Sequence, residues 1–235
     1  MKVLPFIKFS YKNYMRQHRY LRDLAAVVLF SIFFGGFLTS DQLQEGIWWV
    51  FAVFALILNL LTAPSVFFMD NGNTLYFLLG QPHGRRRLLI AKIVLIVLID
   101  LAWVAIFALA YGLRFADAGY FLLLPFRLII IAMVLTLSTL LLSFSYTYHP
   151  QLSWLIFLVL IFGNIVNKEK LFPIEKLSDL PGLLALLLPP FFEINFISVA
   201  VDVTVWHAAF AGLAIVQGAI LFWLTSRKMM QKDFF

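Results

Sequence analysis

Six apolar stretches dominate this sequence and largely determine what it can fold into. A lipid core of about 30 Å needs about 20 apolar residues in a helix that rises 1.5 Å per residue. The six stretches are residues 24–38, 47–69, 88–113, 120–144, 152–166 and 203–225. Of the 235 residues, 63% are hydrophobic and only 13% are charged, which excludes a soluble domain with a single core. We therefore expect an all-α membrane protein in which residues 1–235 form one domain with six transmembrane helices.

The N-terminal segment, residues 3–20, has the pattern of an amphipathic helix. One face carries Lys8, Lys12, Arg16 and Arg19 at helical spacing, and apolar and aromatic residues occupy another face. Such a helix lies in the plane of the lipid headgroups, with its cations close to anionic lipid. The sequence therefore predicts an interfacial helix before the first span.

Residues 180–201 are also apolar, but Pro189 and Pro190 interrupt them. Each proline removes a backbone donor, and lipid offers no replacement for the lost hydrogen bond. We therefore predict two short external helices that enter one leaflet and return, instead of a seventh span.

The distribution of positive charge predicts the orientation in the membrane. Lysine and arginine concentrate at the N-terminus, between the second and third spans, and after the last span, whereas most acids fall in the other loops. By the positive-inside rule, we expect both termini to be cytoplasmic. We expect the membrane to be a bacterial inner membrane. The net charge of +6 therefore reflects topology, and we expect no nucleic-acid partner. Without cysteine, thiolate metal sites and disulfides are excluded.

The basic loop between the second and third spans contains the pattern of a two-turn helix. Asn73 or Thr74 can cap its start, and Gly80 and Pro82 end it. Its apolar face would carry Leu75, Leu78 and Leu79. A helix this short is unstable alone in water, so its apolar face must dock on the membrane domain or on a partner.

This loop resembles the coupling loop of type-2 ABC exporter permeases. That family shows an acidic residue, then Gly-Thr-Leu, two residues, Leu-Leu, two residues, a proline, and a lysine ten positions after the proline. In this sequence the positions that correspond to the family pattern are Asp70, Gly72, Thr74, Leu75, Leu78, Leu79, Pro82 and Lys92. The sequence departs from the pattern in two places: Asn73 is inserted before Thr74, and Tyr76 stands where an acidic residue is usual. The basic residues Arg85, Arg86 and Arg87 follow.

The resemblance covers nearly the whole chain, and it implies a transport function. Two permease chains, identical or related, would form a substrate pathway above two separate ATPase subunits, and the coupling helix would transmit their closure. Because this chain contains no G-x-x-x-x-G-K-[ST] motif, ATP and Mg would bind to the partner ATPase. This chain would then be a transport subunit with no catalytic residue and no cofactor of its own. Its short length is similar to that of the haem-exporter permeases of cytochrome c maturation.

Three charged residues in or near the apolar segments are candidates for the pathway or for helix packing. Asp100 lies in the middle of the third span, where a carboxylate is costly, and we favour a helix-packing or protonated group over a proton relay. Arg127 is expected to extend toward the outer end of its span instead of pairing with Asp100. Glu193 either contributes to an exit gate or, as we slightly favour, caps a helix or is solvated.

Two other classes of function remain open. A secondary transporter driven by an ion gradient is compatible with Asp100, and a membrane anchor for a cytoplasmic partner is compatible with the basic loop. A lipid-modifying enzyme is disfavoured, because no H-E-x-x-H, G-x-S-x-G or paired-aspartate motif occurs. The four histidines lack metal-ligand spacing, so we predict no metal or haem site. The transported substrate stays open among lipid, haem, peptide and drug-like molecules.

Overall fold

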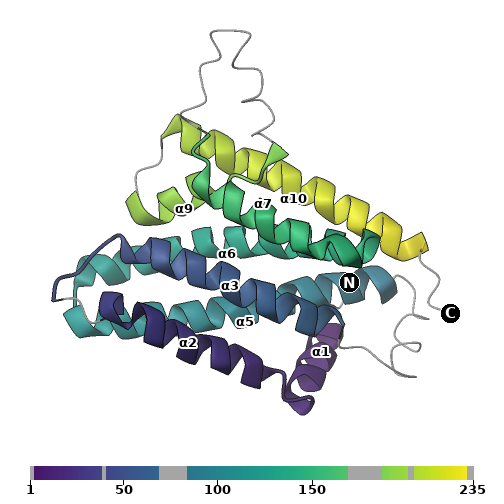
Figure 1. Ribbon diagram of the computed structural model, residues 1–235, viewed down its shortest axis with the longest axis horizontal. Helices are drawn as coiled ribbons and strands as arrows, with labels where there is room; N and C mark the ends of the chain where they lie inside the picture. The colour runs from purple at the N-terminus through teal and green to yellow at the C-terminus, as the bar shows by residue number, and fades with distance from the viewer. Residues whose placement is uncertain (1–2, 39–40, 69–83, 169–186, 201–203, 232–235) are drawn as a thin grey trace, which may run out of the picture.

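The computed structural model describes residues 3–38, 41–68, 84–168, 187–200 and 204–231, and these residues are helical with no strand (Figure 1). The α-helices in this part of the chain are α1 (Leu4–Arg16), α2 (Tyr20–Leu38), α3 (Ile47–Phe67), α5 (Gly84–Phe115), α6 (Ala118–Tyr148), α7 (Ser153–Ile165), α9 (Phe191–Ala200) and α10 (Val205–Gln231). A short 3-10 helix, η1 (Pro150–Leu152), precedes α7. The prediction of an all-α fold is confirmed for these residues.

Among the described residues, four helices are long and apolar enough to cross a bilayer. They are α3, α5, α6 and α10. They identify a multi-pass membrane protein. Helix α2 has 19 residues and α7 has 13, and they coincide with the two other predicted spans. Six crossings therefore remain a prediction.

Several predicted boundaries require correction. Helix α5 begins at Gly84, four residues before the predicted span, so Arg85, Arg86 and Arg87 lie in its first turns and not in a loop. The helix predicted over 3–20 ends at Arg16, because His18 adopts a left-handed backbone conformation with φ 54° that interrupts the helix.

The predicted external segment also differs from the structure. One helix, α9, occupies its second half, beginning directly after Pro190. The first half, 180–186, lies outside the described residues, so the predicted second short helix is not tested.

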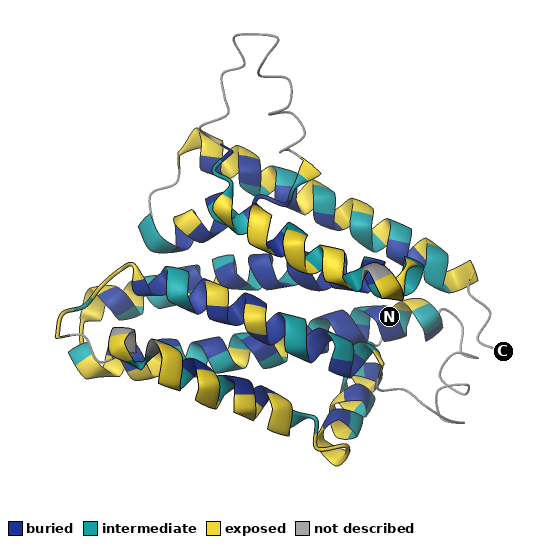
Figure 2. Ribbon diagram, viewed as in Figure 1, coloured by how far each residue is buried: buried dark blue, intermediate teal, exposed yellow. Residues whose placement is uncertain are grey.

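Helix α6 lies at the centre of the bundle. Figure 1 shows α3, α5 and α2 on one side of it and α7, α9 and α10 on the other. Many residues of α2, α7 and α10 are exposed (Figure 2). They include the large apolar residues Phe33, Trp154 and Ile215. A soluble monomer rarely leaves so much contiguous apolar surface exposed, whereas lipid solvates it.

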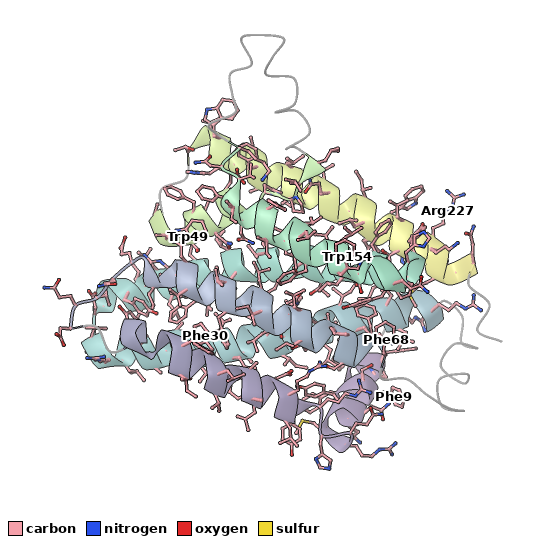
Figure 3. The ribbon with its side chains drawn as sticks, viewed as in Figure 1. Phe9, Phe30, Trp49, Phe68, Trp154 and Arg227 are labelled. Atoms are coloured by element: carbon pink, nitrogen blue, oxygen red, sulfur yellow. The ribbon has the colours of Figure 1, made fainter. Side chains whose placement is uncertain are left out.

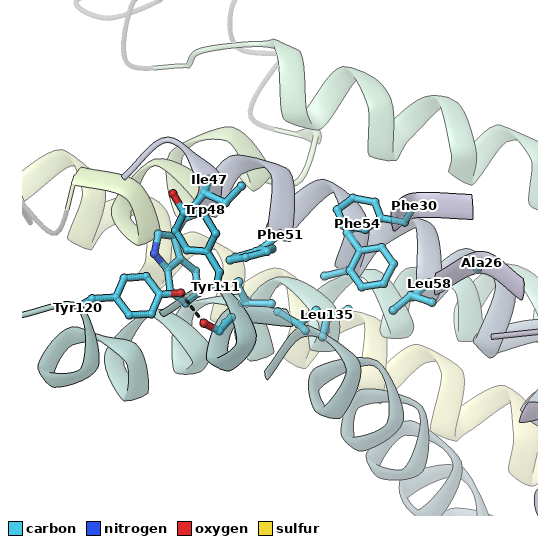
Figure 4. Close-up of a cluster of buried hydrophobic side chains, with 14 residues drawn as sticks. Ala26, Phe30, Ile47, Trp48, Phe51, Phe54, Leu58, Tyr111, Tyr120 and Leu135 are labelled. Carbon is cyan, nitrogen blue, oxygen red and sulfur yellow. Dashed lines mark hydrogen bonds between the residues drawn. The ribbon is translucent and has the colours of Figure 1, made fainter. Parts of the chain in front are cut away.

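Aromatic residues fill the core between α2, α3, α5 and α6 (Figure 4). The rings of Phe30 and Phe54 stack with centroids 4.0 Å apart, and Trp48 meets Phe51 edge to face at 5.4 Å. The hydroxyl of Tyr120 donates to the Ala108 carbonyl at 2.9 Å, so its polar end is satisfied inside the core. This packing fixes the angle of α3 against α5 and α6.

The α7–α9 contact depends on a glycine. A Cβ atom at Gly163 would lie 2.9 Å from the Phe191 ring and 2.9 Å from the Pro189 carbonyl oxygen. One of these neighbours is backbone and cannot move alone, so α7 and α9 would have to separate.

We predict that Gly163→Ala lowers the stability of the purified protein by about 1–3 kcal/mol, because the added methyl group overpacks this contact. The matched control is Gly212→Ala in α10, where no heavy atom lies within 4 Å of the added carbon. Thermal unfolding in detergent measures both variants. Equal stability of the two would contradict the close α7–α9 approach.

Candidate functional site

The predicted coupling loop is bounded by the end of α3 and the start of α5. Its residues Asp70, Gly72, Thr74, Leu75, Leu78, Leu79 and Pro82 lie outside the described residues. The structure does describe the end of α3 and the start of α5, which are the two anchor points of the loop. It also describes Arg85, Arg86, Arg87 and Lys92. These anchors lie at the end of the bundle that also holds α1 and the C-terminal end of α10, which we call the cation-rich end (Figure 1).

Lys92 joins the two anchor points directly. Its Nζ donates to the carbonyl of Phe67, the last residue of α3, at 2.9 Å, and it lies 5.7 Å from the centroid of the Phe67 ring. The last carbonyls of a helix have no intrahelical donor, and the helix dipole places negative charge there. Lys92 therefore places positive charge at the end of α3 from the third turn of the helix that follows the loop.

Two further cations bind backbone carbonyls in the last turns of α3. Arg22 donates to the Leu61 carbonyl, and Arg19 donates to the Ser65 carbonyl. Pro64 sits between them and supplies no N–H, so this end of α3 lacks one of its own donors. These bonds attach the connection between α1 and α2 to α3 just before the loop.

The first turns of α5 contact the last turns of α10. Arg85 Nη1 donates to the Met230 carbonyl at 2.7 Å, and the Arg86 guanidinium lies 5.6 Å from the centroid of the Phe222 ring. Arg227 projects at the same end as Phe68 (Figure 3). The predicted arginine run thus packs against the C-terminal helix as well as carrying charge.

A second candidate site is a polar cluster inside the bundle, centred on Asn59. Its Nδ2 donates to Asp100 Oδ2 and to Thr139 Oγ1, each at 2.8 Å. Ser138 Oγ donates to Asn59 Oδ1, also at 2.8 Å. All four side chains are fully buried. The cluster ties α3, α5 and α6 together, which is the usual role of an amide within a membrane bundle.

The cluster continues toward α1 through a second buried acid. Thr62, one turn after Asn59 on α3, neighbours both Asp100 and Asp23 of α2. The hydroxyl of Tyr14, on α1, donates to Asp23 Oδ2. Burial, together with this bond to Asp23, raises the pKa of Tyr14. A row of polar groups therefore leads from α1 to the centre of α5.

The sequence analysis missed Asp23, Thr62 and Tyr14. The first span was predicted to begin at residue 24, so Asp23 fell just outside it. An acid three residues after the start of α2 was the available signal, because a carboxylate at the head of an apolar helix needs a partner.

Arg127 extends away from Asp100, toward the opposite end of the bundle. Its Nη2 lies 3.4 Å from Glu45 Oε1, and its guanidinium stacks over Trp48 at 5.2 Å from the ring centroid. The Arg127 side chain is only 2% exposed, whereas that of Glu45 is 61% exposed. Arg127 thus connects α6 to the start of α3 through Glu45 and Trp48, and these contacts are separate from the polar cluster.

Glu193 forms a buried ion pair, so the expectation of a solvated charge is wrong. Its Oε2 lies 3.4 Å from Lys168 Nζ, and its Oε1 accepts the Lys168 backbone N–H at 2.5 Å. Lys168 Nζ also donates to the Pro189 carbonyl at 3.2 Å. Burial lowers the pKa of Lys168, and the Glu193 carboxylate opposes that shift. The pair holds the segment after α7 against the first turn of α9.

Within the residues that the structure describes, no three side chains of the His, Cys, Asp or Glu type come together as metal ligands. No family model, no curated protein and no solved structure matches this chain. The candidate sites therefore rest on the geometry given above.

We predict that Glu193→Gln destabilises the protein by about 3 kcal/mol, because Lys168 would be left buried without a counter-charge. The double variant Glu193→Gln/Lys168→Met removes both charges and should recover much of the loss. The control is Asp41→Asn, an exposed acid elsewhere in the chain. A double variant as unstable as Glu193→Gln would show that the ion pair is not the cause.

Proposed function

We propose that this chain is the membrane-spanning subunit of an ATP-binding cassette exporter. The observation that carries the proposal is the spacing of Thr74, Leu75, Leu78, Leu79, Pro82 and Lys92, on a connection between two apolar helices that ends in basic residues. In the proposal, two copies of the chain, or one copy and a related permease, enclose the substrate pathway. A separate ATPase subunit binds ATP and Mg. The complex lies in a bacterial inner membrane with both termini cytoplasmic.

The contacts of Lys92 support a mechanical role for this connection. Because Lys92 bonds to Phe67, a force on the loop acts on the end of α3 and the start of α5 together. Asn59 and Asp100 join the same two helices deeper in the bundle, and Thr139 extends that link to α6. Movement imposed by a partner at the cation-rich end would therefore reach the central helix as a rigid-body shift.

The charges at the cation-rich end support the proposed orientation. The basic residues that the structure describes there are Lys8, Lys12, Arg16, Arg19, Arg22, Arg85, Arg86, Arg87, Lys92, Arg227 and Lys228. The exposed acids Asp41 and Glu45 lie before α3, near the opposite end. A cytoplasmic position for the cation-rich end satisfies the positive-inside rule.

A secondary transporter driven by an ion gradient is the second candidate, since two acids, Asp23 and Asp100, are buried in the bundle. An anchor for a cytoplasmic partner is the third. The dependence of transport on an ATPase separates the exporter from both.

We predict that replacing Leu75, Leu78 and Leu79 together by serine abolishes coupling to the ATPase, because the helix would lose its docking face. The control replaces the same three residues by methionine, which keeps that face apolar. The measurement is co-purification with a co-expressed ATP-binding cassette ATPase subunit, and substrate-stimulated ATP hydrolysis in proteoliposomes. Coupling that persists in the serine variant, or transport without any ATPase, would refute the proposal.

A further inference from the structure

We propose that Asp23, Thr62 and Asp100 form a binding site for one small monovalent cation, either a proton or an alkali-metal ion, in the core of the bundle. This inference goes beyond the exporter proposal and does not depend on it. It rests on the charge balance of the cluster and on which of its oxygen atoms already have partners.

The cluster carries more negative than positive charge. Asp23 and Asp100 are both fully buried, and they interact with each other unfavourably. Arg22 is the cation that interacts with Asp23, and its guanidinium also donates to the Leu61 carbonyl. In the described residues Asp100 has no cationic partner within ion-pair distance. With two carboxylates and one guanidinium, the site lacks one positive charge.

This imbalance is costly where Asp100 lies. Asp100 is the seventeenth of the 32 residues of α5, near the middle of an apolar helix. A carboxylate there cannot be hydrated as it is at a membrane surface, and an uncompensated charge in lipid costs several kcal/mol. One bound cation per site would remove the imbalance.

Some oxygen atoms of the cluster accept a hydrogen bond and are called held, and the others make none and are called open. Asp100 Oδ2 is held by Asn59, and Asp23 Oδ2 is held by Tyr14. Asp100 Oδ1, Asp23 Oδ1 and the Thr62 hydroxyl are buried and make no hydrogen bond of normal geometry. Thr62 neighbours both acids, so the open oxygen atoms belong to one cluster. Hard cations and protons prefer such carboxylate and hydroxyl oxygens.

The charged and polar groups around Asp100 come from four other helices. Helix α1 contributes Tyr14 and α2 contributes Arg22 beside Asp23. Helix α3 contributes the uncharged Asn59 and Thr62. Helix α6 contributes the uncharged Ser138 and Thr139, which bond to Asn59, and Tyr146, which interacts with Arg22. Arg22 is the only one of these groups that carries positive charge, and it balances one of the two carboxylates. A single further positive charge balances the other, so the required ligand is monovalent and not divalent.

The test is the thermal stability of the purified chain in detergent, measured over a pH series and in different salts at equal ionic strength. The salts are the chlorides of sodium, lithium, potassium, choline, magnesium and calcium. A ligand that binds only the folded state raises Tm, and above its Kd the stabilisation grows with the logarithm of the ligand concentration. We expect the Tm of the wild-type protein to rise by a few degrees with an alkali ion, or to rise as pH falls. Asp100→Asn should lose this response, and Asp41→Asn should keep it.

Two readouts distinguish the sources of the charge. A response to sodium or lithium at constant pH identifies a metal ion. A protonated-carboxyl band in the infrared spectrum, absent from Asp100→Asn and present in Asp41→Asn, identifies a proton. Thr62→Val, which removes the hydroxyl and keeps both acids, should weaken either response and remains informative if Asp100→Asn fails to fold.

Three results would overturn the inference. They are a wild-type Tm that responds to neither pH nor alkali ions, an unchanged response in Thr62→Val, and a response to magnesium or calcium alone. Since no ATPase is present in these measurements, their outcome is independent of the exporter proposal.

Discussion

The hydrogen bonds of Asn59 are the interaction on which the rest of the bundle depends. Lipid provides no hydrophobic force that would press apolar helices together, so position must come from packing and from buried polar contacts. Asn59 uses its amide nitrogen and its amide oxygen to bind Asp100 on α5 and both Ser138 and Thr139 on α6. These bonds fix the register of α3 in the aromatic core that it forms with α2, α5 and α6. Without this amide, α3 would lose its buried polar link to α5 and α6.

Further contacts hold α3 on both sides of Asn59. Toward the cation-rich end, Thr62 and Asp23 connect the centre to Tyr14 on α1. At the same end, Arg19, Arg22 and Lys92 bind carbonyls in the last turns of α3. Toward the other end, Arg127 and Glu45 close the start of α3. Helix α3 is therefore held along its whole length, and the connection that follows it is the natural place for a partner to move the bundle. The Lys168–Glu193 pair attaches α9 to the segment after α7, and it shares no residue with the contacts that hold α3.

Much of the fold follows from apolar length alone, because α3, α5, α6 and α10 each exceed what a bilayer requires. The helix ends were less predictable. Arg85, Arg86 and Arg87 were predicted as loop residues because they are charged, but α5 begins at Gly84 and includes all three. Arg85 and Arg86 contact α10. The end of α1 depends on the left-handed backbone conformation of His18. The amphipathic pattern of residues 3–20 did not predict this interruption of the helix. Asp100 was visible as an isolated acid, whereas its approach to Asp23 depends on how α2 packs on α3, which periodicity does not encode.

The most direct test of the exporter account is the composition of the assembled complex. Native mass spectrometry of the chain co-expressed with an ATP-binding cassette ATPase subunit, in a lipid nanodisc or detergent, gives the number of each subunit without reference to any substrate. The account predicts two permease chains, identical or related, with two ATPase subunits, and dissociation of the ATPase subunits when the connection between α3 and α5 is deleted. A chain that remains alone, or that binds an ATPase equally well without this connection, would contradict it.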